Sequence, residues 1–194
     1  MKIDTLEKAN EVFKKIPGIS KKLAEKISTF ILNQSTDFSV ELVNAIQDIK
    51  DNIVYCSQCN FIRENNKCLN CDDPLKMNSL MIVESITTLI KIDEMGIFFG
   101  FYFVLPELLS VKQKNDYKYE YQQLFEFIGN HNFDEIMIVL SPSLEGEMTT
   151  AHLQKLLQKR GIKATRAAIG MPMGSNLEYL DPFTIKQAIK NRNI

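Results

Sequence analysis

The sequence predicts an α/β protein in which a small helical module and a cysteine-rich segment precede a parallel β-sheet flanked by helices. Three observations support this fold class: helical periodicity before residue 50, four cysteines confined to one short stretch, and apolar runs that alternate with helical patterns thereafter. Such alternation is typical of parallel sheets. We expect four parts, covering residues 1–55, 56–72, 79–170 and 171–194, the last being a short loop and helix.

Composition indicates an ordinary soluble protein. The chain has 194 residues, of which 45% are hydrophobic and 24% charged, with a formal net charge of −1. That charge does not by itself indicate nucleic-acid binding, so any basic surface must be local. No apolar run is long enough to cross a membrane, and the first residues lack the apolar core of a secretory signal. We therefore expect a cytoplasmic protein with no membrane partner.

The N-terminal residues predict two short helices joined by a tight turn. Residues 4–14 carry apolar side chains at helical spacing, and Pro17-Gly18 ends that pattern. Ser20 can cap a second helix that runs through Leu32. A third helix is expected over residues 40–49. Its apolar side chains should point inward; they are Val40, Val43, Ile46 and Ile49.

The turn between the first two helices resembles a helix-hairpin-helix motif. Backbone N–H groups at such a helix start can approach a phosphate, and Lys21, Lys22 and Lys26 would add sequence-independent charge. The alternative is an ordinary helical hairpin with solvated lysines. The usual motif has glycine, a hydrophobic residue and glycine, whereas this chain has Gly18-Ile19-Ser20. The motif alone leaves both interpretations open.

All four cysteines form two pairs with two-residue spacers, Cys56 with Cys59 and Cys68 with Cys71. Two such knuckles can place four thiolates around one zinc ion at roughly 2.3 Å. The alternatives are two disulfides or four unrelated core thiols. Disulfides need an oxidising compartment, and unrelated thiols would not be confined to one stretch. We predict one closed, structural zinc site that contributes to folding.

The rest of the chain alternates between strand and helix patterns. Strands are expected at 80–84, 98–105, 136–140 and 162–168, helices at 85–92, 121–128 and 148–160, and a polar loop or helix entrance at 112–121. Gly170 to Asp181 is a glycine- and proline-containing loop, a candidate ligand loop. A closing helix is predicted from Pro182 to Lys190, capped by Asp181.

Acidic residues follow two of the predicted strands. Glu84 follows the first, and Glu145 with Glu147 follows the third. Because the carboxyl ends of parallel strands meet at one edge, these carboxylates could together bind Mg²⁺. For Glu145 and Glu147 the alternative is simpler, since acids are favoured in the first turn of a helix.

The order of these motifs resembles the RecR family of bacterial recombination proteins along nearly the whole chain. The most specific pieces are Ser141 to Glu147 and Gly170 to Asp181. The resemblance implies a Toprim domain, a ring-shaped homotetramer around DNA and no enzymatic activity. It also implies that the protein helps RecO, and in some settings RecF, to load RecA onto single-stranded DNA coated by SSB.

The resemblance also implies roles for individual residues. Lys22 and Lys26 correspond to the family's DNA-contacting residues, and the four cysteines to its zinc ligands. Glu84 corresponds to the first Toprim glutamate, while Glu145 and Glu147 fall on the second acidic motif. The face that carries these acids is implied to meet RecO. DNA binding should show little sequence preference and accept single and double strands.

Three departures from the related sequences concern the acidic face. Catalytic Toprim enzymes carry Asp-x-Asp-x-Asp where this chain has Ser141, Ser143 and Glu145. The Gly-Gly segment expected after the second strand is replaced by Val104-Leu105-Pro106-Glu107. The usual Gly-Asp of the last loop is replaced by Ser175-Asn176. An alternative function, a Mg²⁺-dependent Toprim nuclease or primase-like enzyme, would have to use Glu84, Glu145 and Glu147 with too few oxygen ligands. We therefore expect a protein that is not an enzyme.

Overall fold

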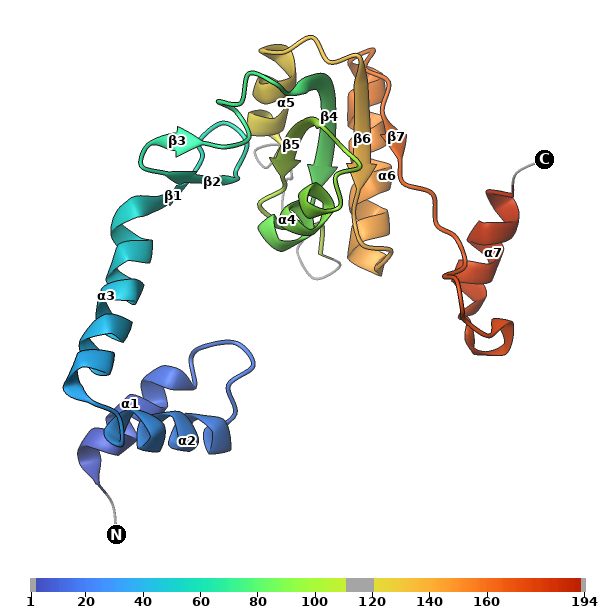
Figure 1. The fold of residues 1–194 in the computed structure, drawn as a ribbon. Helices are drawn as coiled ribbons and strands as arrows, with labels where there is room; N and C mark the ends of the chain where they lie inside the picture. Colours follow the sequence, from blue (N-terminus) through green and yellow to red (C-terminus); the bar gives the residue numbers. More distant parts are fainter. Residues whose placement is uncertain (1–2, 111–120, 193–194) are drawn as a thin grey trace. The chain divides into compact units, whose positions relative to one another are not determined.

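A computed structural model describes residues 3–110 and 121–192 (Figure 1). The chain divides into two compact units, with the division between Ile53 and Val54. Most of the polar segment predicted at 112–121 lies outside the described residues. Among the helices of the described part, none is both long and apolar enough to span a membrane.

The N-terminal unit contains α1 (Asp4–Phe13), α2 (Lys21–Leu32) and α3 (Thr36–Asn52). The predicted helix start is confirmed, since the Oγ of Ser20 accepts a hydrogen bond from the backbone N–H of Leu23 at 3.3 Å. α1 and α2 pack together around Ala24, and the hydroxyl of Ser28 donates to the side chain of Asn10 at 2.6 Å. Gly18 has a φ of +84°, a conformation in which glycine carries no steric penalty.

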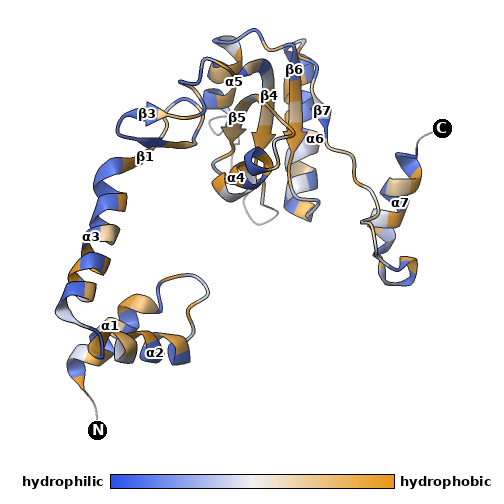
Figure 2. Cartoon of the chain, in the orientation of Figure 1, coloured by the Kyte–Doolittle hydropathy of each residue, from blue (hydrophilic) through white to orange (hydrophobic). Residues whose placement is uncertain are grey.

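The prediction that the apolar side chains of α3 point inward is wrong. None of the described residues of α3 is buried, and Val40, Val43, Ile46 and Ile49 are between 52% and 63% exposed. The first turn of α3 contacts α2 through the rings of Phe38 and Phe30, whose centroids lie 5.8 Å apart. Beyond that turn the apolar side chains are exposed, and the ribbon of α3 alternates between blue and orange in Figure 2.

The cysteine-rich segment forms a small sheet of its own. Its strands are β1 (Ile53–Tyr55), β2 (Ile62–Glu64) and β3 (Lys67–Cys68), in that order. β2 and β3 are antiparallel, and Asn65 and Asn66 form the turn between them with φ of 49° and 64°. Two left-handed residues are typical of tight hairpins, and asparagine tolerates that conformation well.

The predicted parallel sheet is confirmed. It contains β4 (Met77–Val83), β5 (Gly100–Val104), β6 (Glu135–Val139) and β7 (Thr165–Arg166), in the order β5-β4-β6-β7, and every pair is parallel. The flanking helices are α4 (Ile86–Glu94), α5 (Gln122–Gly129) and α6 (Leu144–Lys159). The strands are strongly apolar (Figure 2), and the core includes Leu80, Ile82, Tyr102, Phe103, Leu153 and Leu157.

Several boundaries differ from the predictions, and α3 is longer than the expected 40–49. α6 begins at Leu144 and not at residue 148, because Ser143 caps it by accepting a hydrogen bond from the backbone N–H of Gly146. β7 contains two residues where seven were expected. The closing elements are a 3₁₀ turn (Leu177–Tyr179) and α7 (Pro182–Lys190), and Asp181 caps α7 as predicted.

Candidate metal centre and acidic strand ends

The four cysteines converge on one point. Their Sγ atoms all lie within 4.8 Å of one another, with Cys56 and Cys71 3.9 Å apart and Cys59 and Cys68 3.7 Å apart. A tetrahedral metal–thiolate centre with bonds of roughly 2.3 Å has sulfur atoms about 3.8 Å apart. Three of the cysteines are buried and Cys71 is half-buried. The ligand set therefore fits a closed, four-coordinate metal ion.

The backbone of each knuckle is shaped for this convergence. In the first, the N–H of Cys56 donates to the carbonyl of Phe61 at 2.6 Å, and Asn60 has a φ of 59°. In the second, the N–H of Cys71 donates to the Sγ of Cys68 at 3.4 Å. The carboxylate of Asp72 accepts from the N–H of Cys68 at 2.8 Å. These short-range hydrogen bonds orient both sulfur atoms of each pair towards the point on which all four converge.

The thiols influence one another's ionisation strongly. Hydrogen bonds from Cys59 and Cys71 lower the pKa of Cys68, whereas the hydrogen bond to Cys68 raises the pKa of Cys59. Hydrogen bonds to Cys59 and Cys68 raise the pKa of Cys71 well above its ordinary value. Four thiolates so close together repel one another unless a cation lies among them. The chemistry of the donor set therefore matches a divalent metal ion.

Two asparagines, which the sequence analysis missed, attach the knuckles to β5. The side chain of Asn70 donates to the carbonyl of Tyr102 and accepts from its N–H, both at 2.8 Å. The side chain of Asn60 donates to the carbonyl of Val104 at 2.9 Å. Asn60 directly follows Cys59 and Asn70 directly precedes Cys71, and this adjacency to a cysteine was the available signal.

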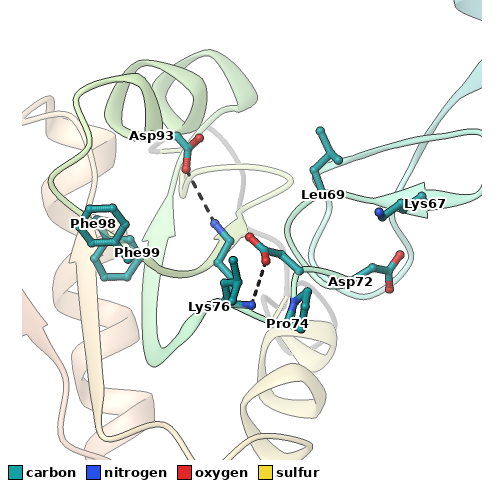
Figure 3. A pocket seen from close by; sticks show the side chains of 10 residues that line it. Lys67, Leu69, Asp72, Pro74, Lys76, Asp93, Phe98 and Phe99 are labelled. Atoms are coloured by element: carbon teal, nitrogen blue, oxygen red, sulfur yellow. Dashed lines mark hydrogen bonds and ion pairs between the residues drawn. The ribbon is translucent and has the colours of Figure 1, made fainter.

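A hollow of about 530 Å³ lies beside the second knuckle, at the amino ends of β4 and β5. Figure 3 shows Lys76 extending towards Asp93, and the two side chains form an ion pair of 3.8 Å. The Nζ of Lys76 also lies 5.1 Å from the centre of the Tyr102 ring. Leu69, Phe98 and Phe99 line the hollow. It lies at the amino ends of the strands, whereas the predicted glutamates follow the carboxyl ends of β4 and β6.

The three predicted lysines lie at the start of α2 and are exposed. Lys22 and Lys26 are four residues apart and so share one face of the helix. Lys14, on the other side of the turn, is paired with Glu11 at 2.9 Å. That hydrogen bond is the main cause of the lowered pKa of Glu11, and the charge of Lys21 lowers it further. The hairpin turn is thus flanked by lysines on both sides.

Glu84 follows β4 at the carboxyl end of the sheet. Its carboxylate accepts the backbone N–H of Ser141 at 2.9 Å and also the hydroxyl of Ser141, which follows β6. An aspartate at position 141 would place a second carboxylate there. The serine instead connects the carboxyl ends of β4 and β6 through its hydrogen bonds to Glu84.

Glu145 and Glu147 lie in the first turn of α6, as the helix-start interpretation predicted. Glu147 forms a bidentate ion pair with Arg166 of β7, with N–O distances of 2.6 and 3.0 Å. Gly146 lies between them because a Cβ there would collide with the carbonyl of Ser141. Arg166 was not identified from the sequence, because its partner is 19 positions away.

The acidic residues do not gather as the cysteines do. Among the described residues, the cysteine set is the one group of three or more cysteine, histidine or acidic side chains close enough to hold a metal ion. Glu84 and Glu147 instead bind partners within the chain. The structure therefore places the acids at neighbouring strand ends without joining them into one site.

This arrangement defines a class: a cluster of four cysteines that can hold a metal ion, joined to a parallel sheet of the Toprim type. A family profile described as "Toprim domain" matches residues 78–168, and a profile described as "RecR, C-terminal" matches residues 170–193. Several curated relatives match along most of their length.

Three of these relatives have the same name, "Recombination protein RecR". The protein of Mycoplasmopsis pulmonis is 37% identical over 92% of this chain and 93% of its own length. Those of Staphylococcus aureus (strain Newman) and Roseiflexus castenholzii are 32% and 31% identical, over 97% and 94% of this chain and 96% and 90% of their own lengths. The chain belongs to the RecR family of recombination proteins.

Proposed function

We propose that this protein is a non-catalytic DNA-binding clamp of recombinational repair. It would form a ring homotetramer and help RecO, and in some settings RecF, to load RecA onto single-stranded DNA coated by SSB. The observation that carries the proposal is the match to RecR proteins over 90–96% of their length. The hairpin, the cysteine centre and the sheet all fall within it.

The metal ion would be zinc. A closed set of four thiolates is the usual ligand set of structural zinc, and it leaves no position for a substrate. Zinc would supply folding energy to a segment whose strands have only two or three residues each. Its role in the clamp would be to hold the knuckles together, with Cys56, Cys59, Cys68 and Cys71 as ligands.

The DNA contacts would come from Lys21, Lys22 and Lys26 at the start of α2. These exposed side chains surround a helix N-terminus, which favours phosphate. A chain with net charge −1 would bind weakly alone, and a symmetric ring would multiply the contacts. Binding should therefore fall steeply with added salt and depend little on sequence.

The acidic strand ends would serve partner binding and not catalysis. Glu84 and Glu147 are engaged with Ser141 and Arg166, and Glu145 lies half-buried beside them. Phosphoryl-transfer chemistry needs Mg²⁺ held by several free oxygens. An acidic surface of this kind suits a basic partner, which we propose to be RecO.

The clamp proposal can be tested by measuring mass in solution with and without a DNA fragment. Light scattering after gel filtration should show a tetramer that takes up DNA. The double variant Lys22→Glu with Lys26→Glu should keep the tetramer and lose DNA binding by at least roughly tenfold, because charge reversal replaces attraction to phosphate with repulsion.

The matched control is Lys155→Glu with Lys159→Glu. These lysines are also exposed and four residues apart, on α6, so the net charge changes equally. The control should bind DNA like the parent protein. A stable monomer or dimer without DNA uptake, or equal losses in both double variants, would contradict the clamp proposal.

A further inference from the structure

The free edge of the parallel sheet is covered by the cysteine knuckles. β5 is the outermost strand and pairs only with β4 among the strands of the sheet. Its inward-facing groups bond to β4; for example, just beyond its end the N–H of Leu105 donates to the carbonyl of Val83 at 2.8 Å. The other edge of an outermost strand normally presents unpaired N–H and C=O groups, which can pair with another chain.

Here the outward-facing groups of Tyr102 and Val104 are all occupied. Asn70 bonds both the N–H and the carbonyl of Tyr102. The N–H of Val104 donates to the carbonyl of Cys59 at 2.9 Å, and its carbonyl accepts from Asn60. The first knuckle thus covers the edge at Val104, and the second knuckle covers it at Tyr102. A side-chain amide, which carries both donor and acceptor groups, replaces a missing backbone neighbour.

Asn70 also contacts the ligand set. Its Nδ2 lies 3.9 Å from the Sγ of Cys71, and the residue is only 2% exposed. One buried side chain therefore contacts a metal-ligating sulfur and the edge of the sheet together. Groups that hold metal ligands in place from outside the coordination sphere commonly link a metal site to its surroundings.

We propose that the four-cysteine centre acts as a metal-dependent cap for the edge of β5, with Asn70 as the positioning residue that couples the two. The knuckles have little core of their own, so their shape depends on the metal ion. When the ion is lost, Asn60 and Asn70 are released and the edge at Tyr102 and Val104 becomes open. This goes beyond the proposed function, because it requires neither DNA nor a partner protein.

Hydrogen exchange at single amides of the full metal-loaded chain tests the proposal. The amide of Tyr102 reports on Asn70, and that of Val104 reports on the first knuckle. The amide of Leu105 is the internal reference, since it faces β4. In Asn70→Ala the metal content should stay at the parent value while Tyr102 exchanges roughly tenfold faster, the factor expected for one lost hydrogen bond. Leu105 should stay within roughly twofold of the parent.

The matched control is Leu69→Ala. Leu69 precedes Asn70 in the same knuckle, but its side chain is 63% exposed. This variant should leave all three amides unchanged. If Asn70→Ala does not fold, chelation of the parent chain provides the test, because the amide of Tyr102 donates to Asn70 there.

Removing the metal with a chelator should accelerate Tyr102 and Val104 together and spare Leu105. Unchanged exchange at Tyr102 after chelation would overturn the proposal. Equal acceleration of Leu105 would also overturn it, since the metal would then support the whole sheet and not its edge. Loss of the metal from Asn70→Ala would place Asn70 within the metal site itself and likewise overturn its coupling role.

Discussion

The cysteines and the glutamates are two sets of possible metal ligands, and they are arranged in opposite ways. The four sulfurs lie within 4.8 Å of one another, whereas Glu84 bonds to Ser141 and Glu147 pairs with Arg166. The cysteines converge because each pair is built by one turn of backbone. The glutamates depend on where separate strands end and on which neighbours compete for their oxygens. A local motif is therefore a safer guide to a metal site than acids at neighbouring strand ends.

The largest effect should come from breaking the cysteine set. Cys59→Ser removes a fully buried ligand, so the metal content should fall from one ion per chain towards zero. Unfolding of the knuckles should require at least about 3 kcal/mol less free energy, because their folding is coupled to metal binding. Metal analysis and thermal unfolding measure both results. Glu84→Gln, as the comparison variant, should keep its metal, and a Cys59→Ser protein that retained a full complement would contradict this account.

An intermediate effect should follow from placing a second carboxylate beside Glu84. Ser141→Asp removes the hydroxyl hydrogen bond to Glu84, keeps the backbone one and adds a like charge, so the free energy of unfolding should fall by about 1–2 kcal/mol. Millimolar Mg²⁺ should restore part of that loss in the variant and do nothing for the parent. Denaturant unfolding with and without Mg²⁺ measures this.

Ser143→Asp is the matched control for that experiment. Ser143 caps α6 with its hydroxyl, and aspartate is an equally good cap, so stability should barely change. If the parent protein gained as much stability from Mg²⁺ as Ser141→Asp, its glutamates would already form a metal site, and the contrast with the cysteines would disappear.

The smallest effect concerns the strand that the knuckles cover. The hydroxyl of Tyr102 is buried and has no hydrogen-bond partner among the described residues, while the ring packs against Phe98. Tyr102→Phe removes that unpaired group and keeps the ring, so the free energy of unfolding should rise by up to about 1 kcal/mol. Denaturant unfolding measures it, with the exposed Tyr179→Phe as a control that should not change.

The same variant has a pH signature. Burial, with a smaller contribution from the charge of Asp93, raises the pKa of Tyr102 to about 12. The unfolded phenol ionises near pH 10, so the unfolded chain loses this proton first as pH rises. The contribution of Tyr102 is therefore constant below pH 10, and stability falls between pH 10 and 12. Tyr102→Phe should lose less stability over that interval; an equal loss would show that other groups account for it.

Local patterns predicted much of the fold. The helix starts at Ser20 and Asp181, the order of strands and helices and the cysteine set all follow from spacing over a few residues. Features that depend on distant partners were missed. Periodicity gave the apolar face of α3 but not its exposure, and Asn70 and Arg166 bond to residues 32 and 19 positions away. Spacing within one segment carries no information about such partners.

The position of the knuckles along the chain has a consequence for synthesis. The ligand set is complete at Cys71, whereas β5 begins only at Gly100. A ribosome makes the chain from its N-terminus, so the cap can bind its ion before the strand that it covers has emerged. The apolar segment Gly-Phe-Tyr-Phe-Val of β5 would then meet a finished docking surface as it emerges. A newly made strand of this composition is otherwise prone to pair with neighbouring nascent chains. Because the cysteine motifs precede β5 in the chain, the cap can form first and limit the pairing of β5 with other nascent chains.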